Sequence, residues 1–120
     1  MALPTLTPEQ RAAALQRATE ARRTRAAVRD ELRRAGVRVP QVLSDVLARA
    51  EHDDAVGKMR VAALLDAVPG IGKIRAAALM ERLNISASRR VRGLGTHQRA
   101  ALVDAFADES VAAAASRPVG

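Results

Sequence analysis

The chain has 120 residues, enough for one domain, and 48% of them are hydrophobic, enough to form a core. Its 20 Lys and Arg residues outnumber 13 Asp and Glu residues, and the net charge of +7 favours polyanionic partners, nucleic acid before anionic membrane. The absence of cysteine excludes disulfides and thiolate metal sites, and a single aromatic residue, Phe106, excludes base stacking as the main mode of binding.

Composition also predicts the fold class and the compartment. Ala and Leu, which form helices well, are abundant, and the aromatic residues that sheets favour are nearly absent, so we expect an all-α protein. No apolar run is long enough to span a membrane, and residues 1–10 do not resemble a secretory signal. We therefore expect a cytoplasmic protein without membrane attachment, cofactor or metal.

A long helix is predicted at the N-terminus, over residues 8–35. The stretch 7–10 reads Thr-Pro-Glu-Gln, in which Thr is a helix cap, Pro suits the first helical position and Gln completes a capping box. Gly36 is a suitable residue to end the helix. Leu15 is almost the only large apolar residue of the first half, so that half is expected to project, to fray or to lie on a partner.

One face of this helix is basic. At about 100° per residue, a sector roughly 80° wide collects Arg11, Arg22, Arg25, Arg29 and Arg33. Beside it runs a stripe expected to dock on the core, Ala21, Val28, Leu32 and Ala35. The basic face can follow a phosphate backbone, but a solvated face relieved by Glu20, Asp30 and Glu31 fits the helix equally well. A second basic block, residues 58–107 with nine Lys and Arg against three acids, favours the phosphate interpretation.

Two shorter helices follow. Pro40 is expected to open the first, whose core-facing residues are Val42, Leu43, Val46, Leu47 and Ala50, and the acidic run 51–54 ends it. Residues 56–59 form a turn or a helix entry. The next helix has an apolar face of Val61, Leu64, Leu65 and Val68, and Pro69 and Gly70 end it.

The most specific local pattern is Val-Pro-Gly-Ile-Gly-Lys-Ile-Arg-Ala at 68–76. Gly70 and Gly72 permit backbone torsions and a close approach that a β-carbon would block, and Ile71 is expected to plug the turn into the core. The following helix begins at about Lys73. Ala76 and its neighbour Ala77 keep the two helices close.

This pattern predicts an anion site. The first amides of a helix lack intrahelical acceptors and carry the positive end of the helix dipole, and Lys73 and Arg75 add charge beside them. The pattern is that of a helix-hairpin-helix, which contacts the DNA backbone rather than the bases. Its spacing differs from a Walker A loop, and no strand precedes it as in a dinucleotide-binding fold. An ordinary tight turn between two helices is the alternative interpretation.

A second hairpin-like element follows. The helix 73–83 is expected to turn Ile74, Leu79 and Leu83 toward the core. Three arginines, Arg89, Arg90 and Arg92, then precede Gly93 and Gly95, and clustered guanidinium groups suit phosphate oxygens. Thr96 is expected to cap a last helix that carries Ala100, Leu102, Val103 and Phe106, and residues 108–120 are expected to be disordered.

Four stretches resemble one known family, actinobacterial integration host factor of the mycobacterial type. They are residues 1–15, 56–65 (VGKMRVAALL), 69–86 (PGIGKIRAAALMERLNIS) and 88–98 (SRRVRGLGTHQ). The resemblance implies a long basic helix over 1–35, a helix-two-turns-helix DNA-binding domain over 36–107, similar to that of a small-subunit ribosomal protein and some DNA glycosylases, and a tail over 108–120.

The resemblance further implies a monomeric nucleoid-associated protein that binds double-stranded DNA with little sequence preference, bends or compacts it, and supports phage integrase complexes. Charge pattern and resemblance together predict the DNA-binding residues Gly70, Ile71, Gly72, Lys73, Arg75, Arg89, Arg90, Arg92, Gly93, Arg11, Arg22, Arg25, Arg29, Lys58 and Arg60.

The sequence also bears on three other functions. An enzyme is disfavoured, because only His52 and His97 supply imidazole, and no Ser/His/Asp or paired-carboxylate spacing stands out. An RNA-binding protein of ribosomal type is the main alternative, although the tail lacks the long basic extension typical of such proteins. A membrane-surface role for the first helix is weak, because the helix has no Trp/Phe/Leu face.

Overall fold

The computed structural model describes residues 5–116, and the surroundings of their side chains as far as Ala107. The secondary structure of this part of the chain is helical, without a β-strand, so the predicted all-α class is confirmed. The elements are α1 (Pro8–Arg34), the 3-10 turn η1 (Gly36–Arg38), α2 (Val39–Arg49), α3 (Asp54–Gly57), α4 (Val61–Asp66), α5 (Gly72–Arg82), the 3-10 turn η2 (Val91–Gly93) and α6 (Thr96–Ser116). None of the helices among these residues is long and apolar enough to cross a membrane.

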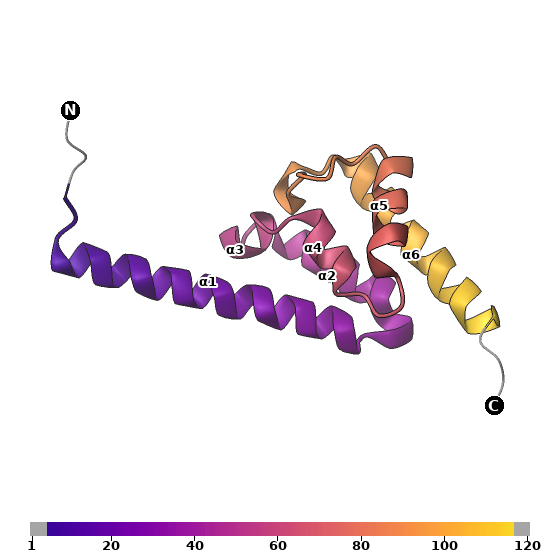
Figure 1. The fold of residues 1–120 in the computed structure, drawn as a ribbon, viewed down its shortest axis with the longest axis horizontal. Helices are drawn as coiled ribbons and strands as arrows, with labels where there is room; N and C mark the ends of the chain where they lie inside the picture. The colour runs from indigo at the N-terminus through magenta and orange to yellow at the C-terminus, as the bar shows by residue number, and fades with distance from the viewer. Residues whose placement is uncertain (1–4, 117–120) are drawn as a thin grey trace.

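The first helix begins and ends as the sequence predicts. The Thr7 amide donates to Gln10 Oε1 at 2.9 Å, and the Gln10 amide donates to Thr7 Oγ1 at 3.1 Å, so the capping box is confirmed. Gly36 follows the helix with φ +57, a left-handed conformation that favours glycine. Only Val28 and Leu32 of α1 are fully buried. Leu15 is 63% exposed, and the N-terminal half projects beyond the other helices as an intact helix (Figure 1).

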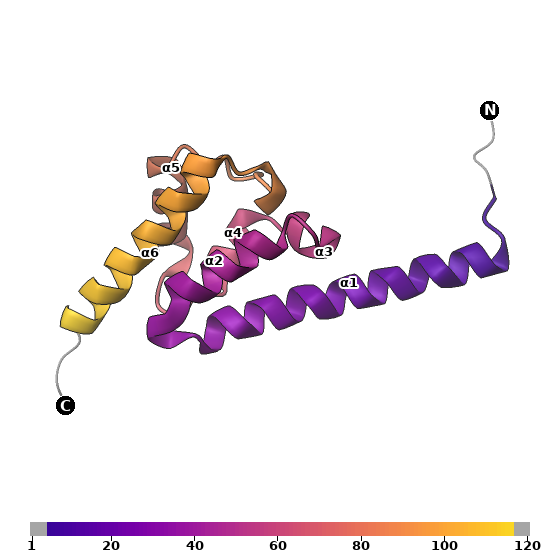
Figure 2. The same cartoon turned by 180° about the vertical axis from the view of Figure 1, so that it is seen from behind.

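The remaining helices close one core, into which α1 inserts its C-terminal half. Helix α6 packs across α2, and α4 lies against α5 (Figure 2). The predicted core residues that are buried are Val28, Leu32, Leu43, Val46, Leu47, Ala50, Val61, Leu64, Leu65, Val68, Leu79, Leu102 and Phe106. Val42, Leu83 and Val103 pack against this core while partly buried. Full burial of a Leu or Val side chain contributes about 1.5–3 kcal/mol, so periodicity identified the main source of stability.

The expectation that Ile74 faces the core is wrong. Its side chain is 86% exposed, whereas the buried face of α5 consists of Ala76, Leu79 and Met80. Ile74 precedes Ala76 by two residues, which is about 200° around a helix, and it therefore points away from the core. The exposed Ala77 likewise lies outside the close contact expected of it, and Ala76 alone of that pair is buried.

Two predicted boundaries near the C-terminus also differ. Thr96 is the first residue of α6 rather than its cap, and the Gly95 carbonyl accepts the first helical bond, from the Arg99 amide at 3.0 Å. The sequence predicts disorder over 108–120, whereas α6 continues to Ser116. Alanine, which recurs in this stretch, has the highest helix propensity of the amino acids, and this explains why α6 continues. Residues 117–120 lie outside the described part.

Candidate nucleic-acid interface

The turn between α4 and α5 has the geometry that its two glycines predict. Gly70 and Gly72 have φ +84 and +68, in the left-handed region that favours glycine. A β-carbon at either position would meet no other part of the described chain within 4 Å. The glycines are therefore required by the backbone conformation and not by crowding within the protein. Ile71 is only 7% exposed, so its predicted role as a plug is confirmed, and only its backbone is available to a partner.

Helix α5 begins at Gly72, one residue before the predicted start, and directs its N-terminus out of the turn. Lys73 and Arg75 of its first turn are exposed, on either side of the exposed Ile74. The first amides of the helix lack intrahelical acceptors and carry the positive end of the dipole. The turn thus combines an exposed helix N-terminus with two cationic side chains, the arrangement that binds phosphate groups.

The arginine cluster around η2 lies beside residues that are distant in sequence. The Val61 amide donates to the Arg89 carbonyl at 3.0 Å, and the Val91 amide donates to the Met59 carbonyl at 2.8 Å. These bonds pair the two chain segments around Arg60 and Arg90 in antiparallel register. Lys58 and Arg60 therefore stand next to the three clustered arginines, a juxtaposition that the sequence did not predict.

Each clustered arginine also donates to an acceptor within the protein. Arg89 Nη1 donates to the Gly93 carbonyl at 2.7 Å, and Arg90 Nη1 donates to the Lys58 carbonyl at 2.6 Å. Arg92 Nη2 lies 2.7 Å from Asp54 Oδ1. A guanidinium group has five N–H donors, so one such bond orients the group and leaves donors for a phosphate. The arginines of η2 are in this way both structural links and candidate ligands.

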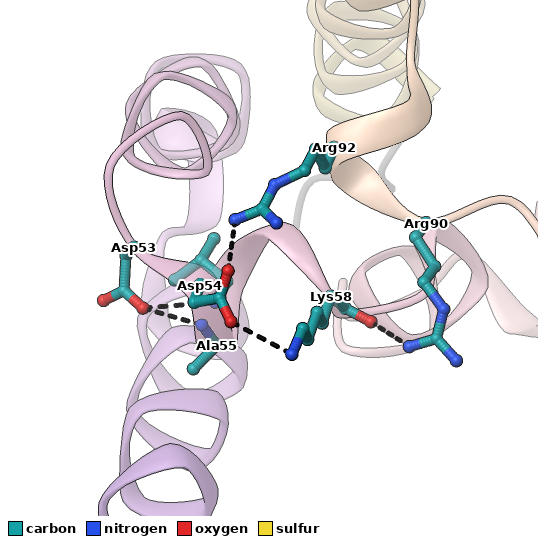
Figure 3. A network of polar contacts seen from close by, with 7 residues as sticks. Asp53, Asp54, Ala55, Lys58, Arg90 and Arg92 are labelled. Atoms are coloured by element: carbon teal, nitrogen blue, oxygen red, sulfur yellow. Dashed lines mark hydrogen bonds and ion pairs between the residues drawn. The ribbon is translucent and has the colours of Figure 1, made fainter. Parts of the chain in front are cut away.

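Asp54 is a charged residue of this region that the sequence prediction missed. Its second carboxylate oxygen lies 3.0 Å from Lys58 Nζ, so Lys58 and Arg92 converge on one carboxylate (Figure 3). Hydrogen bonds from Arg92 and then Lys58 lower the pKa of Asp54 below its usual value. Gly57 permits the contact, because a β-carbon there would lie 2.9 Å from the Ala50 carbonyl oxygen and from Arg92 Nε. The sequence had identified the acidic run 51–54 only as the end of a helix.

The basic face of α1 is largely exposed. Arg11, Arg22, Arg29 and Arg33 are exposed, and Arg25 is half-buried. Two of the three acids that could neutralise this face pair elsewhere: Asp30 bonds Arg34 at 3.2 Å, and Glu31 bonds Arg49 of α2. These ion pairs weaken the interpretation of the face as a solvated, internally neutralised surface.

The predicted DNA-binding residues form three separate groups. The turn 70–75 lies at one end of the helical domain, η2 lies beside α3 at the other, and the arginines of α1 follow the projecting helix (Figure 1). The structure brings Lys58 and Arg60 to the η2 group and does not join that group to the turn. Among the described residues, no group of three His, Cys, Asp or Glu side chains could hold a metal ion.

The class of protein that this fold and its two turns define is the S13-like H2TH domain, whose family model matches residues 37–106. The predicted helix-two-turns-helix architecture is therefore confirmed. A relative from Streptomyces coelicolor named integration host factor is 54% identical over 106 residues, 88% of this chain and 95% of the relative. Relatives of the same name from Mycolicibacterium smegmatis and Mycobacterium tuberculosis are each 53% identical, over 88% of this chain and 97% of theirs. The chain belongs to this actinobacterial integration host factor family.

A solved structure has the same fold. It is the structure of sIHF bound to an 8bp palindromic DNA, with a TM-score of 0.68 and 47% sequence identity, and the match covers 76% of this chain and 98% of that one.

Proposed function

We propose that this protein binds double-stranded DNA through its phosphates, largely without sequence preference, as a non-enzymatic nucleoid-associated protein. The observation that carries the proposal is the α4–α5 turn, in which the positive φ angles of Gly70 and Gly72 expose the N-terminus of α5 beside Lys73. The similarity to sIHF, whose solved structure contains DNA, supports the same ligand.

The positions of the exposed cations support the low sequence preference. Two of the amide side chains that could read adenine in the major groove are engaged within the protein: Gln10 belongs to the capping box of α1, and Gln98 bonds the Asn84 carbonyl at 2.9 Å and the Gly95 amide at 3.0 Å. The exposed cations, in contrast, are arranged around turns and along a helix, where they suit a phosphate backbone.

Bending or compaction of DNA is part of the proposal. The turn 70–75, the η2 group and the basic face of α1 are separate surfaces, so one molecule can grip one bent duplex or two segments. Support of phage integrase complexes, a monomeric state without DNA and a nucleoid location rest on the family relationship. Fluorescence transfer between the labelled ends of a duplex, with and without protein, tests bending directly.

The salt dependence of binding tests the phosphate mechanism. With about six phosphate contacts or more, the affinity for a labelled duplex falls by orders of magnitude between roughly 50 and 200 mM salt. Fluorescence anisotropy titrations at several salt concentrations give the slope of log K against log [salt], and a nearly flat slope contradicts the proposal. An A-form RNA duplex of equal length serves as competitor, and preference for the RNA would instead favour the ribosomal type of function.

A further inference from the structure

The carboxylate of Asp54 occupies a position between two cations that a phosphate could fill. Lys58 Nζ is 3.0 Å from one of its oxygens and Arg92 Nη2 is 2.7 Å from the other. Lys58 directly follows α3, and Arg92 belongs to η2, 34 residues further along the chain. The side chains of Asp54, Lys58 and Arg92 are 65%, 63% and 51% exposed. An anion from solution therefore has access to the same place.

Asp54 is not needed to start its helix. The preceding residue, Asp53, is the N-cap of α3, and its Oδ1 accepts hydrogen bonds from the Ala55 amide at 3.0 Å and the Val56 amide at 3.3 Å. The Asp54 carboxylate points instead toward Lys58 and Arg92 (Figure 3). Because Asp53 already caps the helix, the Asp54 carboxylate is available to bind the neighbouring cations.

We propose that a backbone phosphate of duplex DNA replaces the Asp54 carboxylate between Lys58 and Arg92, so that Asp54 is a built-in competitor of DNA at this site. A phosphodiester, like a carboxylate, presents two anionic oxygens that accept hydrogen bonds from a guanidinium and an ammonium group. In free protein Asp54 holds the two cations in position, and in the complex it releases them. This inference rests on the proposed DNA-binding function and locates one phosphate site within it.

The Asp54→Asn variant tests the proposal, with Asp45→Asn as the matched control. Asp45 is an exposed residue of α2, so both variants raise the net charge by one. An exposed ion pair contributes little to stability, so the two ion pairs of Asp54 oppose DNA binding only modestly. Their loss in Asp54→Asn should make duplex binding about threefold to tenfold tighter than in the control. The slope of log K against log [salt] should match that of the control, because the same phosphate contacts form with and without the carboxylate. Binding by anisotropy and far-UV circular dichroism of both variants supply these values.

A second measurement uses the unaltered protein. The Nε–Hε NMR signal of Arg92 should shift when duplex DNA is added at low salt, because the guanidinium exchanges its carboxylate partner for a phosphate. In the Lys58→Ala/Arg92→Ala background, the gain in affinity from Asp54→Asn should disappear. An equal gain in that background would overturn the proposal, since Asp54 would then act only through the total charge.

The outcomes separate this inference from the function on which it rests. If the wild-type protein binds no duplex at low salt, the proposed function fails. If the wild-type protein binds duplex but Asp54→Asn binds no more tightly than Asp45→Asn, only the role of Asp54 is overturned. Weaker binding by a folded Asp54→Asn variant, or loss of its helical signal, likewise overturns the role, because Asp54 would then be required to support the site.

Discussion

The positive φ of Gly72 makes Gly72→Ala the most direct test of the α4–α5 turn, and Gly36→Ala is its matched control. The two glycines have φ +68 and +57, and a β-carbon at either meets no other part of the described chain within 4 Å. Alanine at these positions therefore changes stability through the backbone alone. A left-handed L-residue costs about 1–2 kcal/mol. Alanine also gives the unfolded chain fewer conformations than glycine does, and this effect offsets about 0.4–1 kcal/mol of that cost.

We thus expect each substitution to lower the free energy of unfolding by about 1 kcal/mol, and Tm by roughly 4 °C for a chain of this size. DNA binding separates the two variants. Gly72 sets the direction of the first amides of α5, and a lost hydrogen bond to a charged group corresponds to about tenfold in affinity. Gly36, at the end of α1 and outside the turn, should leave the affinity unchanged.

Thermal unfolding followed by circular dichroism measures the first effect, and anisotropy with a labelled duplex at low salt measures the second. A β-branched residue in place of Gly72 should weaken binding more than any single exposed Arg→Ala change on α1, such as Arg22→Ala, since the α1 face has several arginines and the turn has one set of amides. Wild-type affinity in a folded Gly72→Ala variant would refute the idea that these amides contact DNA. A wild-type Tm would refute the conformational reason for the glycine.

Two further substitutions test the packing around the site and on α5. Gly57→Ala places a β-carbon 2.9 Å from the Ala50 carbonyl oxygen and should lower the free energy of unfolding in urea by about 1–3 kcal/mol. Gly93→Ala places its β-carbon 3.0 Å from Arg89 Cδ, which belongs to a flexible side chain, and should lower the free energy of unfolding by less. If Gly57→Ala lowers the free energy of unfolding no more than Gly93→Ala does, the backbone at Ala50 must move aside, which contradicts the reasoning. Ile74→Ala should change the free energy of unfolding by no more than about 0.5 kcal/mol, because the side chain is 86% exposed, while Leu79→Ala on the same helix should cost about 2–5 kcal/mol. A large loss for Ile74→Ala would contradict the exposed position.

Features within a few residues of one another were predictable. The capping box joins Thr7 to Gln10, and the left-handed turns at Gly36, Gly70 and Gly72 follow from short patterns that admit few alternatives. The apolar faces of the second and third predicted helices were also found, because a period of 3.6 residues identifies which side chains can be buried together.

The wrong predictions are those for which the local sequence pattern permits more than one structure. The apolar character of Ile74 predicts a core position, but Ala76 belongs to the buried face of α5, and Ile74 lies on the opposite side of the helix. Thr96 is a good cap, yet the preceding Gly95 takes that position. The stretch 108–116 was expected to be disordered from its small residues, whereas the same alanines prolong α6.

The sequence by itself determined the main helices, both ends of α1 and the glycine turn, because hydrogen bonds and steric limits between near neighbours decide these features. It also determined the excess of positive charge. Only the tertiary structure decided which charges meet. The packing of α3 against η2 brings Lys58 and Asp54 to Arg92, across 34 and 38 residues. No local pattern encodes that contact, since it depends on how several helices close around one core.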